Sequence, residues 1–186
     1  ITLNYMSSNK MQGLSAMPAN IQLASAGKTK IITAVNEAYA KQLKYYGINS
    51  VTNQYLVNNE DFTSLSTTFG TDIAFAATTA KIISQSYQNH GVAMIPDMSQ
   101  YGYWGDIREE SEIYSKDYRL LESAVNSCTS MIILPAIYYE YLESASMMSI
   151  YSELFMKDYL RDELGYKGVL MLDSDATSNI YDEQNF

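Results

Sequence analysis

Four times along the chain, an amphipathic helical segment is followed by a turn and a short apolar run. In the first copy, apolar residues recur at steps of three and four from Ile31 to Leu43, and GINSV (47–51) follows. The other copies are TDIAFAATTAKIISQSYQNH before GVAMI (91–95), KDYRLLESAVNSC before SMIIL (130–134), and YSELFMKDYLRDEL before GYKGVLML (165–172). Buried strands that alternate with helices in this way predict a parallel β-sheet covered by helices.

A fifth strand is expected at ITLNY (1–5), so the predicted sheet has five strands. The strands lie farther apart in the sequence than a minimal strand–helix unit requires, and we therefore expect long loops after the strands. In α/β folds these loops carry the functional site. No linker interrupts residues 1–186, and we treat them as one domain.

The charge balance excludes one class of partner. Lys and Arg number 12 against 21 Asp and Glu, the formal net charge is -9, and no basic run occurs. A phosphate backbone is therefore not an expected ligand. The apolar stretches at 73–83 and 131–137 are shorter than the roughly 20 residues that cross a bilayer, so no membrane span is expected.

The single cysteine and the single histidine limit the metal chemistry. With only Cys128 and His90, neither an internal disulfide nor a usual Cys/His zinc set can form, and we expect no cofactor and no metal. Cys128 precedes a predicted buried strand and is expected in the core. His90 ends a helical segment, where contact with the helix dipole is its expected role.

Several segments resemble the catalytic domain of glycoside hydrolase family 3. MPANIQLASAGKTKIITAVNEAYAKQLKYYGIN (17–49) is similar to the family's opening pattern, and FGTD (69–72) is similar to its Phe-Gly-Glu-Asp turn. LRDELGYKG (160–168) resembles the Leu-Arg-x-Glu-Leu-Gly-Phe-x-Gly motif that precedes the family's nucleophile strand. The resemblance implies a (β/α)8 TIM-barrel-like fold. Because an intact barrel takes about 250 residues, the 186-residue chain is expected to be an incomplete or shortened barrel.

The family's nucleophile position falls on Asp173. The acid that closes the family's Gly-Val-x-x-x-Asp strand attacks the sugar, and counting from Gly168 and Val169 reaches this residue. A retaining glycosidase pairs such a carboxylate with a proton donor about 5 Å away. The simpler interpretation is that Asp173 is a strand-end or capping acid retained by descent. Asp175 has no counterpart in the motif.

Other family positions carry different residues here. The family's Lys-His-Phe-Pro-Gly stretch, whose Lys and His bind sugar hydroxyls, is replaced by PDMSQYG (96–102), with Asp97 and Met98 at or near the matched positions. LSTTFG (65–70) lacks the family's arginine, PAIYY (135–139) has Ala136 where one subfamily has histidine, and no histidine occurs between 99 and 120. Loss of several sugar contacts, each worth about 1–3 kcal/mol, predicts weakened substrate recognition.

Aromatic side chains are the remaining candidates for sugar contact. Tyr103 and Trp104 of YGYWG (101–105) either stack on a sugar ring or pack as a lid, and Tyr139 either contacts a ligand or packs at the sheet end. Together these patterns favour a degenerate domain of the family that binds carbohydrate or serves as a scaffold. The alternative is an active retaining β-glycosidase, of the β-glucosidase or β-N-acetylglucosaminidase type, with Asp97 or a glutamate of REESE (108–112) as its acid.

The barrel interpretation also predicts an assembly. We expect a partner chain or a further domain to supply the missing strands, because open sheet edges need cover. The chain opens with ITLNY and no leader, so we expect that a signal peptide has been removed or that the segment belongs to a longer protein. An extracellular or cell-surface location is slightly favoured over the cytoplasm.

Overall fold

A five-stranded parallel sheet organises the molecule. The computed structural model describes residues 2–4, 13–54, 68–98, 107–108, 118–134, 138–139 and 147–172. Neighbouring strands of the sheet follow one another in chain order, and every pairing is parallel: β1 (Thr2–Asn4), β2 (Ser50–Gln54), β3 (Ala93–Asp97), β5 (Met131–Leu134) and β8 (Val169–Leu172). The predicted parallel α/β sheet is therefore confirmed.

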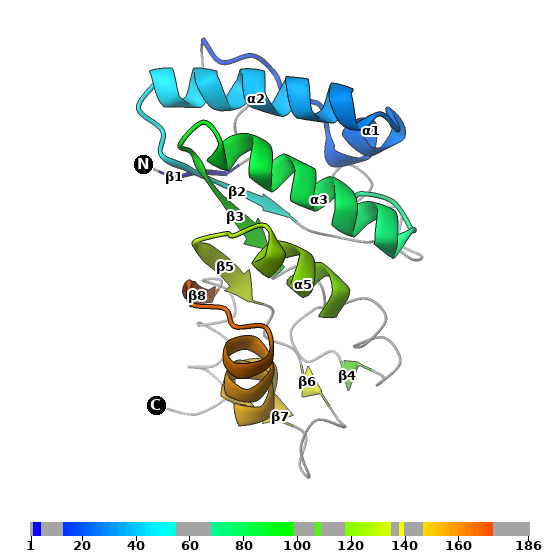
Figure 1. Ribbon diagram of the computed structural model, residues 1–186, viewed down its shortest axis with the longest axis vertical. Helices are drawn as coiled ribbons and strands as arrows, with labels where there is room; N and C mark the ends of the chain where they lie inside the picture. The colour runs from blue at the N-terminus through cyan, green and yellow to red at the C-terminus, as the bar shows by residue number, and fades with distance from the viewer. Residues whose placement is uncertain are drawn as a thin grey trace.

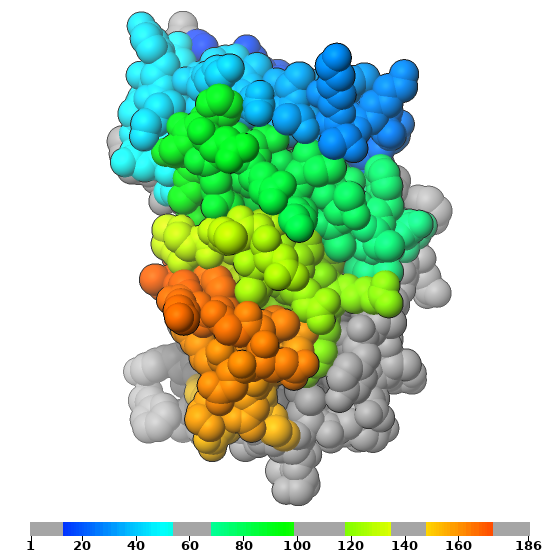
Figure 2. Space-filling model, in the orientation of Figure 1, coloured from blue at the N-terminus to red at the C-terminus, as the bar shows by residue number. Residues whose placement is uncertain are grey.

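Helices connect the strands and lie side by side over the sheet (Figure 1). They are α1 (Asn20–Ser25), α2 (Thr29–Tyr45), α3 (Ile73–Gln88), α5 (Tyr118–Asn126) and the π-helix η6 (Leu154–Glu163). Figure 2 shows the chain as successive bands of colour from blue to orange. Each helix, together with the strand that follows it, packs chiefly against the neighbouring helix–strand units in the sequence. Among the described residues, no helix combines the length and apolar character needed to cross a membrane.

A second, smaller sheet was not expected from the sequence. It consists of β4 (Ile107–Arg108), β6 (Tyr138–Tyr139) and β7 (Met147–Met148), with β4 parallel and β7 antiparallel to β6. The short helix η5 (Ser149–Tyr151) follows β7. Two-residue strands carry no periodic signal, because an alternating pattern needs at least four residues to be recognised.

Polar caps and glycines set the ends of the central helix. The Asp72 carboxylate accepts a hydrogen bond from the Phe75 amide at 3.0 Å and so caps the start of α3. Gly91, with φ at +70°, ends the turn after α3 and directs the chain into β3. In η6 the winding differs from the expected α-helix, since the Leu164 amide donates to the Tyr159 carbonyl five residues earlier.

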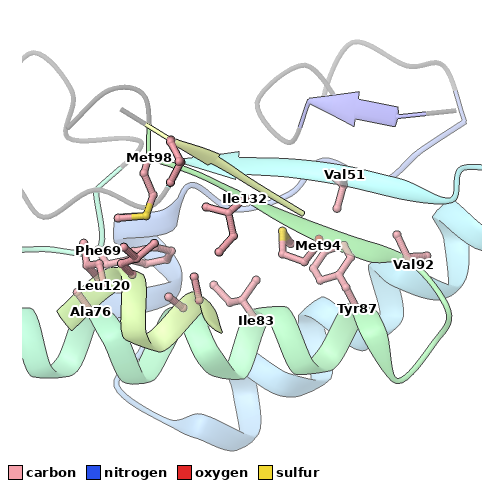
Figure 3. Close-up of a cluster of buried hydrophobic side chains, with 14 of the residues drawn as sticks. Val51, Phe69, Ala76, Ile83, Tyr87, Val92, Met94, Met98, Leu120 and Ile132 are labelled. Atoms are coloured by element: carbon pink, nitrogen blue, oxygen red, sulfur yellow. The ribbon is translucent and has the colours of Figure 1, made fainter. Parts of the chain in front are cut away.

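The core lies between the sheet and α3. Figure 3 shows Val51, Met94 and Ile132 of three adjacent strands directed toward Ile83 and Tyr87 of α3. All five side chains are fully buried. Because side chains alternate along a strand, the intervening residues of β2, β3 and β5 point to the face of the sheet away from α3.

The strand β8 lies at one edge of the sheet. Among the described residues it pairs only with β5. Val169 is 57% exposed, and Met171 and Leu172 are 37% and 38% exposed, although all three are large apolar residues. An exposed apolar edge strand is a surface that proteins ordinarily cover.

A tight corner between η6 and β8 holds Tyr166. The Tyr166 side chain is buried, and its hydroxyl donates to the Val169 carbonyl at 3.4 Å. Burial disfavours the phenolate and raises the pKa of Tyr166 to about 12, against the opposing effects of Thr129 and the Arg161 guanidinium. Burial, together with the nearby Glu122 carboxylate, also raises the pKa of Tyr159 in η6.

Truncation of Ile83 tests the packing of α3. Replacing this fully buried side chain by alanine is expected to lower the free energy of unfolding by about 2–5 kcal/mol, because it leaves a cavity between α3 and the sheet. The matched control is Ile31→Ala on α2, where the side chain is 45% exposed and the expected loss stays below about 1 kcal/mol. Urea denaturation measures both, and equal losses would contradict the packing.

Tyr166 should contribute to the loss of stability in alkali. A folded pKa of about 12 against an unfolded value near 10 means that its contribution is complete below pH 10 and is lost as the pH rises through 12. Tyr166→Phe cannot ionise, so its free energy of unfolding should fall less steeply between pH 10 and 12 than that of the wild type. Tyr45→Phe, at a side chain 85% exposed, should follow the wild type. Urea unfolding at several pH values gives the slopes, and identical slopes for all three proteins would refute the assignment.

Candidate functional site

The carboxyl ends of the parallel strands meet at one edge of the sheet. There β2 ends at Gln54, β3 at Asp97 and β8 at Leu172, directly before Asp173 in the sequence. Polar residues that follow such strands are the usual location of a site in α/β folds. This edge is therefore the candidate site.

Asp97 stands within the described part of this edge. It pairs in register with Gln54 of β2 and with Ile133 of β5, which in turn pairs with Met171 of β8. The Asp97 side chain is half-buried and belongs to the strand face that points away from α3. Its position at the strand end suits a ligand-binding carboxylate, and that role stays a prediction.

Met98 lies in the hydrophobic core instead of at an open surface. Its side chain is 2% exposed and is directed toward the Phe69 region (Figure 3). The Met98 amide donates to the Ile133 carbonyl at 2.9 Å, which continues the β3–β5 pairing one residue past β3. A contact between Met98 and a ligand remains a prediction.

Of the four other predicted site residues, the structure describes only Tyr139. Asp173, Tyr103 and Trp104 lie outside the described residues. Tyr139 belongs to β6, where it pairs with Arg108 of β4 and with Met147 of β7. β5 ends at Leu134, so Tyr139 lies in the small sheet and not in a strand of the main sheet. The pairing with Arg108 brings the start of REESE beside this tyrosine.

The Phe-Gly turn before α3 is held by a buried aromatic ring and by hydrogen bonds within the turn. Phe69 is 1% exposed and belongs to the core. The Thr68 hydroxyl is buried, donates to the Gly70 carbonyl at 3.2 Å and accepts from the Gly70 amide at 3.1 Å. Gly70 has φ at +106°, a conformation that favours glycine. Thr68 is thus engaged within the turn near the position where family 3 enzymes carry their arginine.

A buried amide pair near the same edge was missed by the sequence analysis. Asn20 of α1 and Asn53 of β2 exchange two hydrogen bonds of 3.1 and 3.3 Å, and both side chains are 2% exposed or less. Each amide supplies a donor and an acceptor, so the pair ties α1 to the carboxyl-terminal half of β2. An asparagine in a strand indicates a surface or turn position when it is judged alone, and only its partner in α1 reveals the pair.

His90 and Cys128 lie at the opposite edge of the sheet. Both follow a helix and precede a strand, because each helix returns the chain to the starting edge. The His90 Nε2 atom lies 3.9 Å from Glu37 Oε2 on α2. Cys128 is exposed and has φ at +57°, so the expectation of a core cysteine was wrong. Its left-handed backbone at the end of α5 turns the thiol outward.

The described residues contain no group of three or more His, Cys, Asp or Glu side chains able to hold a metal ion. Among the described strands of the main sheet, only β3 ends in a carboxylate, Asp97, which lies on the face of the sheet away from α3. This carboxylate can hydrogen-bond a polar ligand. Two carboxylates are needed for acid–base hydrolysis of a glycoside.

Comparison with known proteins finds no matching family model and no match among curated proteins. Solved structures do match. The family 3 β-N-acetylglucosaminidase from Paenibacillus sp. str. FPU-7 superposes with a TM-score of 0.78 at 18% identity, covering 92% of this chain and 36% of that one. The β-N-acetylhexosaminidase from Beutenbergia cavernae DSM 12333 has a TM-score of 0.71 at 16% identity, covering 87% and 52%.

A third match is NagZ from Neisseria gonorrhoeae, solved in complex with zinc ion, with a TM-score of 0.70 at 15% identity, covering 93% of this chain and 63% of that one. The chain therefore spans between about a third and two thirds of the length of these proteins. At these identities the comparison supports the shared fold. The chain has the fold of part of the glycoside hydrolase family 3 catalytic domain, as the resemblance of its sequence motifs implied.

Proposed function

We propose that this chain is a catalytically degenerate domain of the family 3 glycosidase type that binds carbohydrate or serves as a scaffold. The observation that carries the proposal is the burial of Met98. This residue stands at or near a family position that binds sugar hydroxyls, and here its side chain packs into the core at 2% exposure. A thioether in the core offers a sugar no hydrogen-bond donor.

The position of Asp97 also favours binding over hydrolysis. Asp97 ends β3, and Asp173 follows β8, which is two strands away across β5. Adjacent strands are about 4.8 Å apart, so β3 and β8 are separated by about 10 Å. A retaining pair needs carboxyl groups about 5–5.5 Å apart. The strand that Asp97 ends therefore lies farther from β8 than such a pair requires, and the alternative reaction would need its acid from elsewhere, such as a glutamate of REESE.

The same proposal includes a barrel. Five parallel strands in chain order, with helices on one face, have the arrangement of an arc of a (β/α)8 barrel. The exposed apolar side chains of β8 support a continuation of the sheet beyond this strand. We infer that further strands, from another segment or from a partner chain, pair with β8 and complete the fold.

A panel of aryl β-glycosides, including the glucoside and the N-acetylglucosaminide, tests the functional proposal. The wild type is expected to release no aryl alcohol above the uncatalysed rate, because Met98 is buried at or near a family position that binds sugar hydroxyls and, among the described strands of the main sheet, only β3 ends in a carboxylate. Binding of the corresponding sugars, measured by calorimetry, should survive Asp173→Ala.

The matched control is Asp175→Ala, which changes an acid two positions away. Turnover that Asp173→Ala abolishes and Asp175→Ala retains would overturn the proposal in favour of an active retaining β-glycosidase. Absence of both turnover and sugar binding, with a stoichiometric complex with another chain, would leave only the scaffold role.

A further inference from the structure

We propose that Arg161 is a positioning residue that sets the register of β8 against β5. Its guanidinium reaches from η6 to the corner that leads into β8. The Nη1 atom donates to the carbonyls of Tyr166 and Gly168 at 2.8 and 2.9 Å. The Cζ atom also lies 5.5 Å from the centre of the Tyr166 ring, a favourable cation–π distance.

The second of these carbonyls lies one residue before the sheet begins. Gly168 precedes Val169, whose amide donates to the Ser130 carbonyl at 2.9 Å as the first hydrogen bond between β8 and the β5 side. A Cβ on Gly168 would stand 2.6 Å from that same Ser130 oxygen and closer still to the Tyr166 ring. The corner thus fits closely against β5, and Arg161 holds it from the other side.

The strand itself specifies its register weakly. All four residues of VLML are apolar, and only Leu170 packs against the core while the other three are exposed, so polarity does not separate the two faces and burial separates them weakly. Register is well determined when one face of a strand is buried and the other is polar. A slip by two residues would keep every β8 side chain on its present face. The contacts that select the register of β8 must therefore lie outside the strand, and the hydrogen bonds at the corner between η6 and β8 supply them.

The register fixes where the chain emerges from the sheet. A slip of two residues would move the residue after β8 by about 6.6 Å along the sheet. A ligand role for Asp173 at the candidate edge would then be lost, because the segment that carries it would start from a different point. That consequence rests on the proposed function, whereas the register itself does not.

Engineered disulfides can report the register directly, in the protein carrying Cys128→Asn. Met131 and Val169 are paired in the present register, and a parallel pair about 4.8 Å apart can be bridged. The cysteine pair 131/169 reports this register, and the pairs 131/171 and 133/169 report slips of two residues in either direction. In the present register the slipped pairs lie about 8 Å apart, too far to bridge.

The expected result is that only the 131/169 pair forms when Arg161 is present. Arg161→Gln should lower its yield at least about fivefold and raise the yield of one slipped pair, as measured by mass spectrometry after thiol alkylation. Lys157→Gln, on the exposed side of η6, should retain the wild-type pattern. An unchanged pattern in Arg161→Gln would overturn the proposal.

If Arg161→Gln does not fold, Arg161→Lys provides the test of whether Arg161 sets the register of β8. It keeps the charge but replaces the planar fork by a single ammonium, so we expect a mixture of the present and slipped pairs. A wild-type pattern in Arg161→Lys would then overturn the proposal. Neither readout involves a sugar, so a negative glycoside assay leaves this test unaffected.

Discussion

The structure depends on the parallel pairing of five strands in the order in which the chain forms them. Each helix returns the chain to the same starting edge, and because the right-handed crossovers all proceed in one direction across the sheet, the helices lie together over one face (Figure 1). That arrangement buries Ile83 and Tyr87 of α3 against three strands at once. It also gathers the carboxyl ends of the strands at one edge, which is where a site can form, and it leaves β8 without a second neighbour among the described residues.

The helices and main strands were predictable because each carries a strong periodic signal over several turns or a compact apolar run. The prediction of secondary structure and contacts failed for features that no local sequence pattern specifies. The strands of the small sheet are too short for a period, and the π-winding of η6 is a choice of hydrogen-bond partner that the spacing of apolar residues does not specify. The pair formed by Asn20 and Asn53 joins positions 33 residues apart, so neither residue indicates the contact alone. Cys128 was assigned to the core by its neighbours, yet its own left-handed backbone turns it outward.

The candidate site, too, could be predicted from the sequence only in part. The edge at which Asp97 lies could be predicted from the alternation of helices and strands, whereas the role that the motif ending at Gly168 implies for Asp173 stays a prediction. The burial of Met98 could not, since a methionine after a strand fits a loop as well as a core. The motif residue Arg161 was noticed only as part of a resemblance. Its two hydrogen bonds to the corner give it a physical role in the path by which β8 reaches the site.

Amide hydrogen exchange along β8 tests most directly whether the sheet is an arc of a larger barrel. Because the Val169 amide faces the β5 side, the alternation of a strand directs the Met171 amide the same way and the amides of Leu170 and Leu172 toward the edge. If further strands complete the sheet, all four amides of the native protein should exchange slowly. Rapid exchange of Leu170 and Leu172, with protection of Val169 and Met171, would contradict the account, because it would mean that β8 is an open edge and the sheet ends there.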